Sequence, residues 1–82
     1  MEKYNGHANY ETWNVCLWID NEEFIYRDKV RLIRRKGDRL TAADVEAFAR
    51  EYFPDGTPDM DGPADMNKVD WDEIADGWKE EE

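Results

Sequence analysis

Few residues in this 82-residue chain are of a type that supports catalysis. His7 is its one histidine and Cys16 its one cysteine, and the chain contains no serine, so no Ser-His nucleophile pair can form. Cys16 lies in the most apolar part of the sequence, whereas an activated thiol needs an exposed, electropositive site. One cysteine allows no disulfide within the chain, and one histidine leaves too few ligands for structural zinc. We therefore expect no enzymatic activity, no metal and no cofactor.

One acidic segment resembles a calcium loop. Asp59-Met60-Asp61-Gly62 matches the middle of an EF-hand. With Gly62 at loop position 6, however, position 1 is Thr57 and position 12 is Lys68, where acidic residues should supply the first ligand and the bidentate last one. A solvated turn rich in Asp, Gly and Pro is the expected structure instead.

Carboxylates are the most abundant charged groups. The chain has 21 acidic and 11 basic residues, a formal net charge of -10 and a pI near 4.4. Residues 51–82 hold twelve acids and two lysines, which sum to -10, whereas residues 21–50 hold eight basic and six acidic residues, which sum to +2. The chain is therefore electrically bipolar, and unaided binding to free nucleic acid or to an anionic membrane is disfavoured.

The acidic segment contains a candidate binding surface. Asp72, Asp76 and Glu80 recur every four residues, so on a helix they form a row that rises by about 6 Å per step. Such a row, with the acids around it, could occupy a site that a partner uses to hold phosphates. The alternative is a solvated helix face that keeps the protein soluble. The candidate partner-binding acids are Asp55, Asp59, Asp61, Asp65, Asp72, Glu73, Asp76 and Glu80.

A second candidate surface is basic. Arg27, Arg31, Arg34 and Arg35 gather on one side of a helical wheel, opposite the apolar residues. They could form an internal ion-pair layer with the acidic segment, bind an acidic surface of a partner, or touch nucleic acid once a partner supplies the other contacts. Trp18 either completes the core or anchors a protein interface together with this stripe.

These side chains must be positioned by helices. Asn9 is a good N-cap for a helix through Ile19, and the Asp20-Asn21 pair predicts a break with a new N-cap. A second helix is expected over residues 22–36, ending at Gly37. Thr41 with Asp44 indicates a capping box and a third helix, which Pro54 ends.

Residues 54–63 hold all three prolines and predict a loop. Asp70 with Glu73 predicts the N-terminus of a last helix, in which Trp71, Ile74 and Trp78 share a face. No segment alternates with the period of a strand. We expect a single all-α domain over residues 1–82, a compact bundle of about four helices with an acidic Pro/Gly/Asp loop before the last one.

The two ends of the chain resemble a known group of proteins. Residues 4–21 contain the signature N-Y-E-T-W-N-V-x-L-W-I-x-N, and residues 69–75, Val-Asp-Trp-Asp-Glu-Ile-Ala, resemble a short V-D-W-x-E-I-A helix. Both are similar to segments of a family of small phage and mobile-element proteins of uncharacterised function. Within the signature, Asn9, Glu11, Thr12 and Asn14 suit capping and buried hydrogen bonds as well as contact with a target.

The resemblance implies a phage or plasmid origin and a role in the bacterial cytoplasm, in keeping with the absence of a leader and of the roughly 18 apolar residues that cross a bilayer. By analogy, small acidic phage proteins block host defences such as CRISPR complexes or restriction enzymes. The first hypothesis is therefore a non-catalytic inhibitor whose acidic surface occupies the nucleic-acid site of a bacterial defence complex. The alternative is a phage regulatory or assembly adaptor that docks on a protein partner through the basic helix and Trp18.

Overall fold

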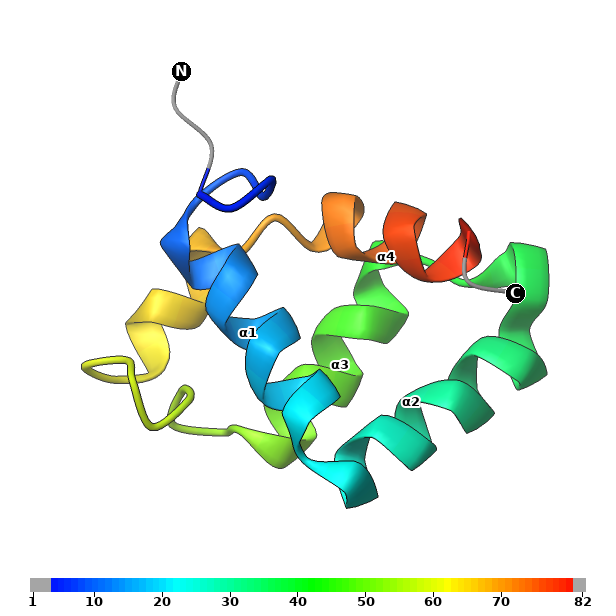
Figure 1. Cartoon of the computed structure of the whole chain (residues 1–82), viewed down its shortest axis with the longest axis horizontal. Helices are drawn as coiled ribbons and strands as arrows, with labels where there is room; N and C mark the ends of the chain where they lie inside the picture. The colour runs from blue at the N-terminus through cyan, green and yellow to red at the C-terminus, as the bar shows by residue number, and fades with distance from the viewer. Residues whose placement is uncertain (1–3, 81–82) are drawn as a thin grey trace.

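The computed structural model describes residues 4–80 and is helical, as predicted (Figure 1). The α-helices are α1 (Tyr10–Asn21), α2 (Glu23–Lys36), α3 (Ala42–Tyr52) and α4 (Trp71–Glu80), and two 3-10 helices are η1 (Gly37–Arg39) and η2 (Pro63–Lys68). Within residues 4–80 no strand forms, and the only β-type pairing there is an isolated bridge between Tyr4 and His7. The predicted all-α fold is confirmed.

Three of the predicted helix ends are confirmed, two of them by side-chain hydrogen bonds and one by its backbone conformation. The Asn9 side chain accepts from the Thr12 N–H at 2.9 Å. Thr41 and Asp44 form a reciprocal capping box at the start of α3. Gly37, at the end of α2, has a φ of 52°, which is accessible to glycine without the strain that a Cβ would add.

The predicted N-cap at Asp20-Asn21 is wrong. α1 continues through Asn21, because the N–H of Glu22 still donates to the Trp18 carbonyl at 3.3 Å. Glu22 alone takes an extended conformation, and its carbonyl accepts from Tyr26 N–H at 2.8 Å as the first bond of α2. One residue therefore separates the two helices, and its side chain makes no capping bond.

Apolar side chains from the four α-helices and from η2 meet in one core. In Figure 1, α4 runs along the upper edge of the view and α2 along the lower right, with α3 between them. α3 packs mainly on α4, and α1 packs mainly on α2. Removing a buried aliphatic or aromatic side chain from water stabilises the fold by about 1.5–3 kcal/mol. The core consists of Val15, Ile19, Ile25, Leu32, Ile33, Leu40, Val45, Ala49, Phe53, Met66, Val69, Ile74, Ala75 and Trp78.

Lys29 is the charged residue of this core. It is 2% exposed, and its Nζ donates to Asp20 Oδ1 at 2.8 Å. The same Nζ lies 5.2 Å from the ring centre of Trp78 and 5.4 Å from that of Tyr26. An ammonium in such a position is stabilised by the negative face of the ring. Lys29 therefore ties α2 to α1 and α4 from the inner side of α2, which leaves the arginines of α2 on the outer side.

The predicted loop is present, but part of it has a regular structure. Residues 53–62 form irregular turns, after which η2 runs from Pro63 to Lys68. Met66 in η2 is fully buried and anchors the segment to the core. The sequence contains no helical periodicity here because a 3-10 helix of six residues is too short to show one.

Candidate functional site

The exposed face of α4 carries the acidic row, Asp72, Asp76 and Glu80. All three side chains are exposed, whereas Ile74, Ala75 and Trp78 on the other face are buried. Within residues 4–80 none of the ion pairs includes a member of the acidic row. The helix therefore holds three carboxylates that no cation of residues 4–80 pairs with, on a support that is fixed by core packing.

The four acids of the loop fall into two groups. Asp55 and Asp61 are exposed. Asp59 accepts hydrogen bonds from Asn14 Nδ2 at 2.8 Å and from Trp18 Nε1 at 2.9 Å, and these bonds lower its pKa. The Asp65 carboxylate accepts from Asp61 N–H at 3.0 Å, which is the main cause of its lowered pKa, and it also pairs with Lys68. Asp59 and Asp65 thus hold the loop in shape, although Asp59 keeps exposed surface.

Glu73 does not belong to the acidic row. One carboxylate oxygen lies 2.7 Å from His7 Nδ1, and the other accepts from Ala8 N–H at 2.7 Å. Its side chain is 29% exposed. The capping box expected at α4 is therefore only half formed: Asp70 accepts from Glu73 N–H at 3.0 Å, but the Glu73 carboxylate binds the N-terminal turn instead of returning to Asp70.

Three polar residues of the N-terminal signature, Asn9, Thr12 and Asn14, make structural hydrogen bonds. Asn14 is fully buried and bonds to the Thr57 hydroxyl and to Asp59, which fixes the loop against α1. Thr12, also fully buried, accepts from Asp70 N–H at 2.8 Å. Asn9 Nδ2 donates to the Lys68 carbonyl at 2.7 Å. These residues were expected either to cap helices and form buried hydrogen bonds or to contact a target. The contacts observed here are caps and buried hydrogen bonds.

Trp18 lies at the edge of the core. It is half-buried, packs against the core and donates its indole N–H to Asp59. The large apolar side chain with the greatest exposure among residues 4–80 is Phe24 of α2, at 74%, and Tyr26 follows at 42%. Sequence reasoning missed Phe24, although its position beside Arg27 and Arg31 on the helical wheel was a usable signal.

The basic stripe of α2 lies on the surface, and within residues 4–80 its ion pairs are formed with acids of the same helix. The stripe consists of Arg27, Arg31, Arg34 and Arg35. Arg27 pairs with Glu23 at 2.6 Å and Arg31 pairs with Asp28 at 3.1 Å. Within the described part of the chain no arginine of α2 pairs with a carboxylate of residues 55–80. The internal ion-pair layer is therefore not formed, and the acidic row is not covered by the basic stripe.

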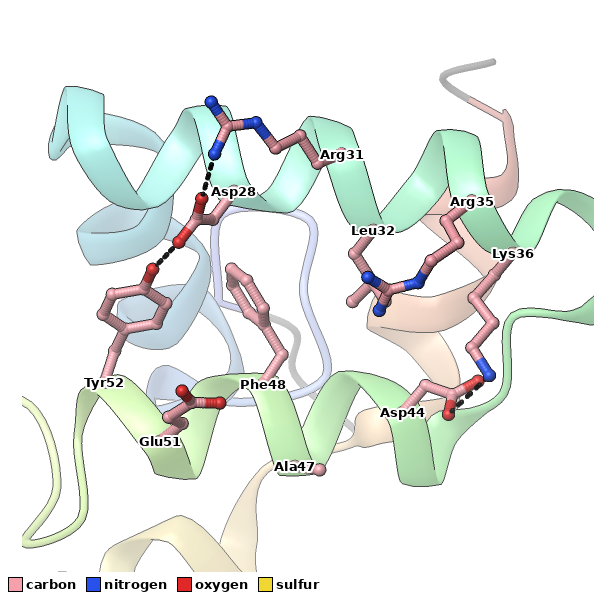
Figure 2. Close-up of a pocket in the computed structure, with 10 residues that line it drawn as sticks. All are labelled: Asp28, Arg31, Leu32, Arg35, Lys36, Asp44, Ala47, Phe48, Glu51 and Tyr52. Carbon is pink, nitrogen blue, oxygen red and sulfur yellow. Dashed lines mark hydrogen bonds and ion pairs between the residues drawn. The ribbon is translucent and has the colours of Figure 1, made fainter.

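A groove of about 530 Å³ opens between α2 and α3 (Figure 2). Its apolar lining comes from Leu32, Ala47, Phe48 and Tyr52. At one end the Tyr52 hydroxyl donates to Asp28, and at the other Lys36 pairs with Asp44 at 3.6 Å. The remaining lining residues are Arg31, Arg35 and Glu51. The helical pattern of each segment is visible in the sequence, but the groove between the segments is not.

The one histidine and the one cysteine belong neither to the acidic row nor to the basic stripe. Cys16 is half-buried against the core. His7 is engaged by Glu73 at the N-terminal turn. Residues 4–80 contain no group of three or more His, Cys, Asp or Glu side chains placed to hold a metal ion. In the same range, every helix is too short or too polar to traverse a lipid bilayer.

Comparison with known proteins identifies a family. The model of a family described as a family of unknown function (DUF7249) matches residues 1–82. No curated protein and no solved structure matches the chain.

Proposed function

The chain belongs to the family of unknown function DUF7249, and on that premise we propose that it is a non-catalytic inhibitor of phage or mobile-element origin. Its target is a bacterial nucleic-acid-handling defence complex of the CRISPR or restriction type. The acidic surface occupies the site at which that complex holds nucleic acid. The proposal places the protein in the bacterial cytoplasm and requires no cofactor.

The observation that carries this proposal is the uncovered acidic row of α4. Asp72, Asp76 and Glu80 are exposed, and no cation within residues 4–80 pairs with them. The row rises by about 6 Å per carboxylate along the axis of α4, against about 3.4 Å of axial rise per phosphate of one DNA strand, so it presents a sparser line of charge. Because α4 is fixed by its buried face, little ordering entropy is lost when the row binds.

Two other features support a target with a cationic binding site. The net charge of -10 speeds association with a positive groove and opposes binding to free nucleic acid. Asp55 and Asp61 add exposed carboxylates in the loop, which Asn14 and Met66 hold against the core. The resemblance of residues 4–21 to phage and mobile-element proteins supports the proposed origin.

Charge reversal in α4 tests the proposal. The wild-type protein and the Asp72→Lys/Asp76→Lys variant are used to retain proteins from a bacterial lysate, and a DNA competitor is then added. We expect the wild type to retain a nucleic-acid-binding complex, which the DNA competitor and added salt both release. The variant should bind this complex at least tenfold more weakly than the wild type. Circular dichroism checks that the variant is still helical.

The matched control is Glu22→Lys/Asp38→Lys. Both residues are exposed, neither enters an ion pair within residues 4–80, and the change in net charge is the same. Retention should persist in this control. If both variants bind like the wild type, or if the retained partner handles no nucleic acid, the acidic-surface proposal is wrong.

The exposure of Phe24 favours a second candidate function, an adaptor that docks on a protein partner through α2. The Phe24 ring is 74% exposed and lies beside Arg27 and Arg31 on α2. Aromatic residues and arginines are both enriched at protein interfaces. In the same assay, Arg31→Glu/Arg34→Glu would be the sensitive variant for this function, and Asp72→Lys/Asp76→Lys would retain the partner.

A further inference from the structure

We propose that the groove between α2 and α3 is a docking site for an amphipathic helix of a partner protein, with acids along the flank that faces α2 and bases along the flank that faces α3. The inference does not rest on the acidic-surface proposal, because none of the lining residues belongs to α4 or to the acidic loop.

The floor of the groove is apolar. Leu32 from α2 is buried, and Phe48 and Tyr52 from α3 are half-buried, so part of each ring remains accessible. The lining residues run from Asp28 to Lys36 on α2 and from Asp44 to Tyr52 on α3, which is about 12 Å along each helix. The apolar floor covers part of this span, because Asp28, Lys36 and Asp44 lie at its ends. A groove of this length between two helices accepts about two turns of a third helix.

The walls of the groove carry opposite charges. Figure 2 shows Arg35 extending from α2 and Glu51 from α3, on opposite sides of the apolar floor. Neither residue enters an ion pair within residues 4–80. The other acids of the lining are already engaged: Asp28 by Arg31 and Tyr52, and Asp44 by Lys36 and Thr41.

These unpaired charges determine the chemistry of the occupant. A carboxylate beside α2 would pair with Arg35, and an ammonium or guanidinium beside α3 would pair with Glu51. Apolar side chains between them would cover Phe48 and Leu32. A nucleic acid fits poorly, because Glu51 repels phosphate and the chain outside α2 is strongly negative. α2 has six basic and two acidic residues and so carries +4, and since the net charge of the chain is -10, the other residues together carry -14.

Selection from a peptide library tests the docking site. The probe is a display library of helix-forming 14-residue peptides in which apolar, acidic and basic positions are randomised, selected against the full chain. We expect enriched peptides with an apolar stripe between an acidic and a basic flank. Arg35→Glu should weaken their binding about tenfold, and replacing the facing peptide acid by Lys should restore it.

Arg34→Glu is the matched control, because Arg34 is exposed in the same last turn of α2 but does not line the groove. The affinity of the Arg34→Glu variant for the enriched peptides should stay within about twofold of the wild-type affinity. Circular dichroism should show equal helicity for the Arg34→Glu and Arg35→Glu variants. Enrichment of no peptide, or equal loss of binding in Arg34→Glu and Arg35→Glu, would overturn the proposal. Binding that is insensitive to both substitutions would also overturn it.

Discussion

At the scale of single residues, the polar positions of α1 connect segments that are far apart in the sequence. Asn14 is fully buried and Thr57 is 2% exposed, and the two side chains are hydrogen-bonded to each other across 43 positions of the chain. Asn14 also donates to Asp59. A buried amide is stable in an apolar helix only when such partners are present. The signature residue Asn14 therefore serves to order the acidic loop.

A double-mutant cycle measures this connection. Asn14→Leu and Thr57→Val should each lower the free energy of unfolding by about 1–3 kcal/mol, because each leaves a buried polar partner unsatisfied. The free energy of unfolding of the double variant should fall by less than the sum of the two single losses. In the double variant both partners of the Asn14–Thr57 hydrogen bond are apolar, so neither is left buried without its partner. Urea denaturation gives the three values, and strict additivity would contradict the proposed coupling.

At the scale of elements, α4 is held by the N-terminal turn as well as by the core. Tyr4 and His7 form a reciprocal backbone bridge around Asn5 and Gly6, whose positive φ values of 48° and 87° allow the tight turn. Glu73 then accepts from Ala8 N–H and contacts His7. Glu73 is adjacent in sequence to Asp72 of the acidic row, yet it contributes to docking of the turn.

Two neighbouring alanine substitutions separate these roles. Glu73→Ala should lower the free energy of unfolding by about 1–2 kcal/mol more than Asp72→Ala, because both lose a favourable interaction with the helix dipole but only Glu73→Ala loses the bonds to the turn. Amide exchange at Ala8 should accelerate only in Glu73→Ala. Equal stability losses, with Ala8 protected in both, would show that Glu73 does not hold the turn.

At the scale of the whole molecule, the charges are segregated. α2 carries +4 and the rest of the chain -14, and the inner face of α2 meets the core through Lys29, so the basic stripe and the acidic row point outward on different helices. This arrangement leaves a strongly negative surface whose mutual repulsion opposes the compact state. It also gives the molecule two separate charged surfaces for partners.

Salt should therefore stabilise the fold. Raising NaCl from about 0.01 M to about 0.15 M shortens the Debye length from about 30 Å to about 8 Å, which screens the repulsion among carboxylates more than it weakens the short ion pairs. We expect the midpoint of thermal unfolding to rise with salt. The rise should be smaller in Asp72→Lys/Asp76→Lys, whose net charge is -10 plus 4, or -6. A midpoint that falls with salt in the wild type would contradict this balance.

Local signals in the sequence were sufficient for the fold class and most helix boundaries. The caps at Asn9, Thr41 and Asp70 and the stop at Gly37 depend on hydrogen bonds or backbone conformations within a few residues, so residue type and spacing reveal them. The acidic row was equally predictable, because residues four apart share a face of a helix.

Contacts between distant segments were decided only by the tertiary structure. Asp72 and Glu73 are equally acidic neighbours, and only the position of His7 and Ala8 makes Glu73 structural. The groove between α2 and α3 depends on the relative placement of two helices, which the helical periodicity of each segment does not predict. The partners of Asn14 and Lys29 likewise come from other parts of the chain. Periodicity specifies which face of a helix is buried, but packing alone determines what that face meets.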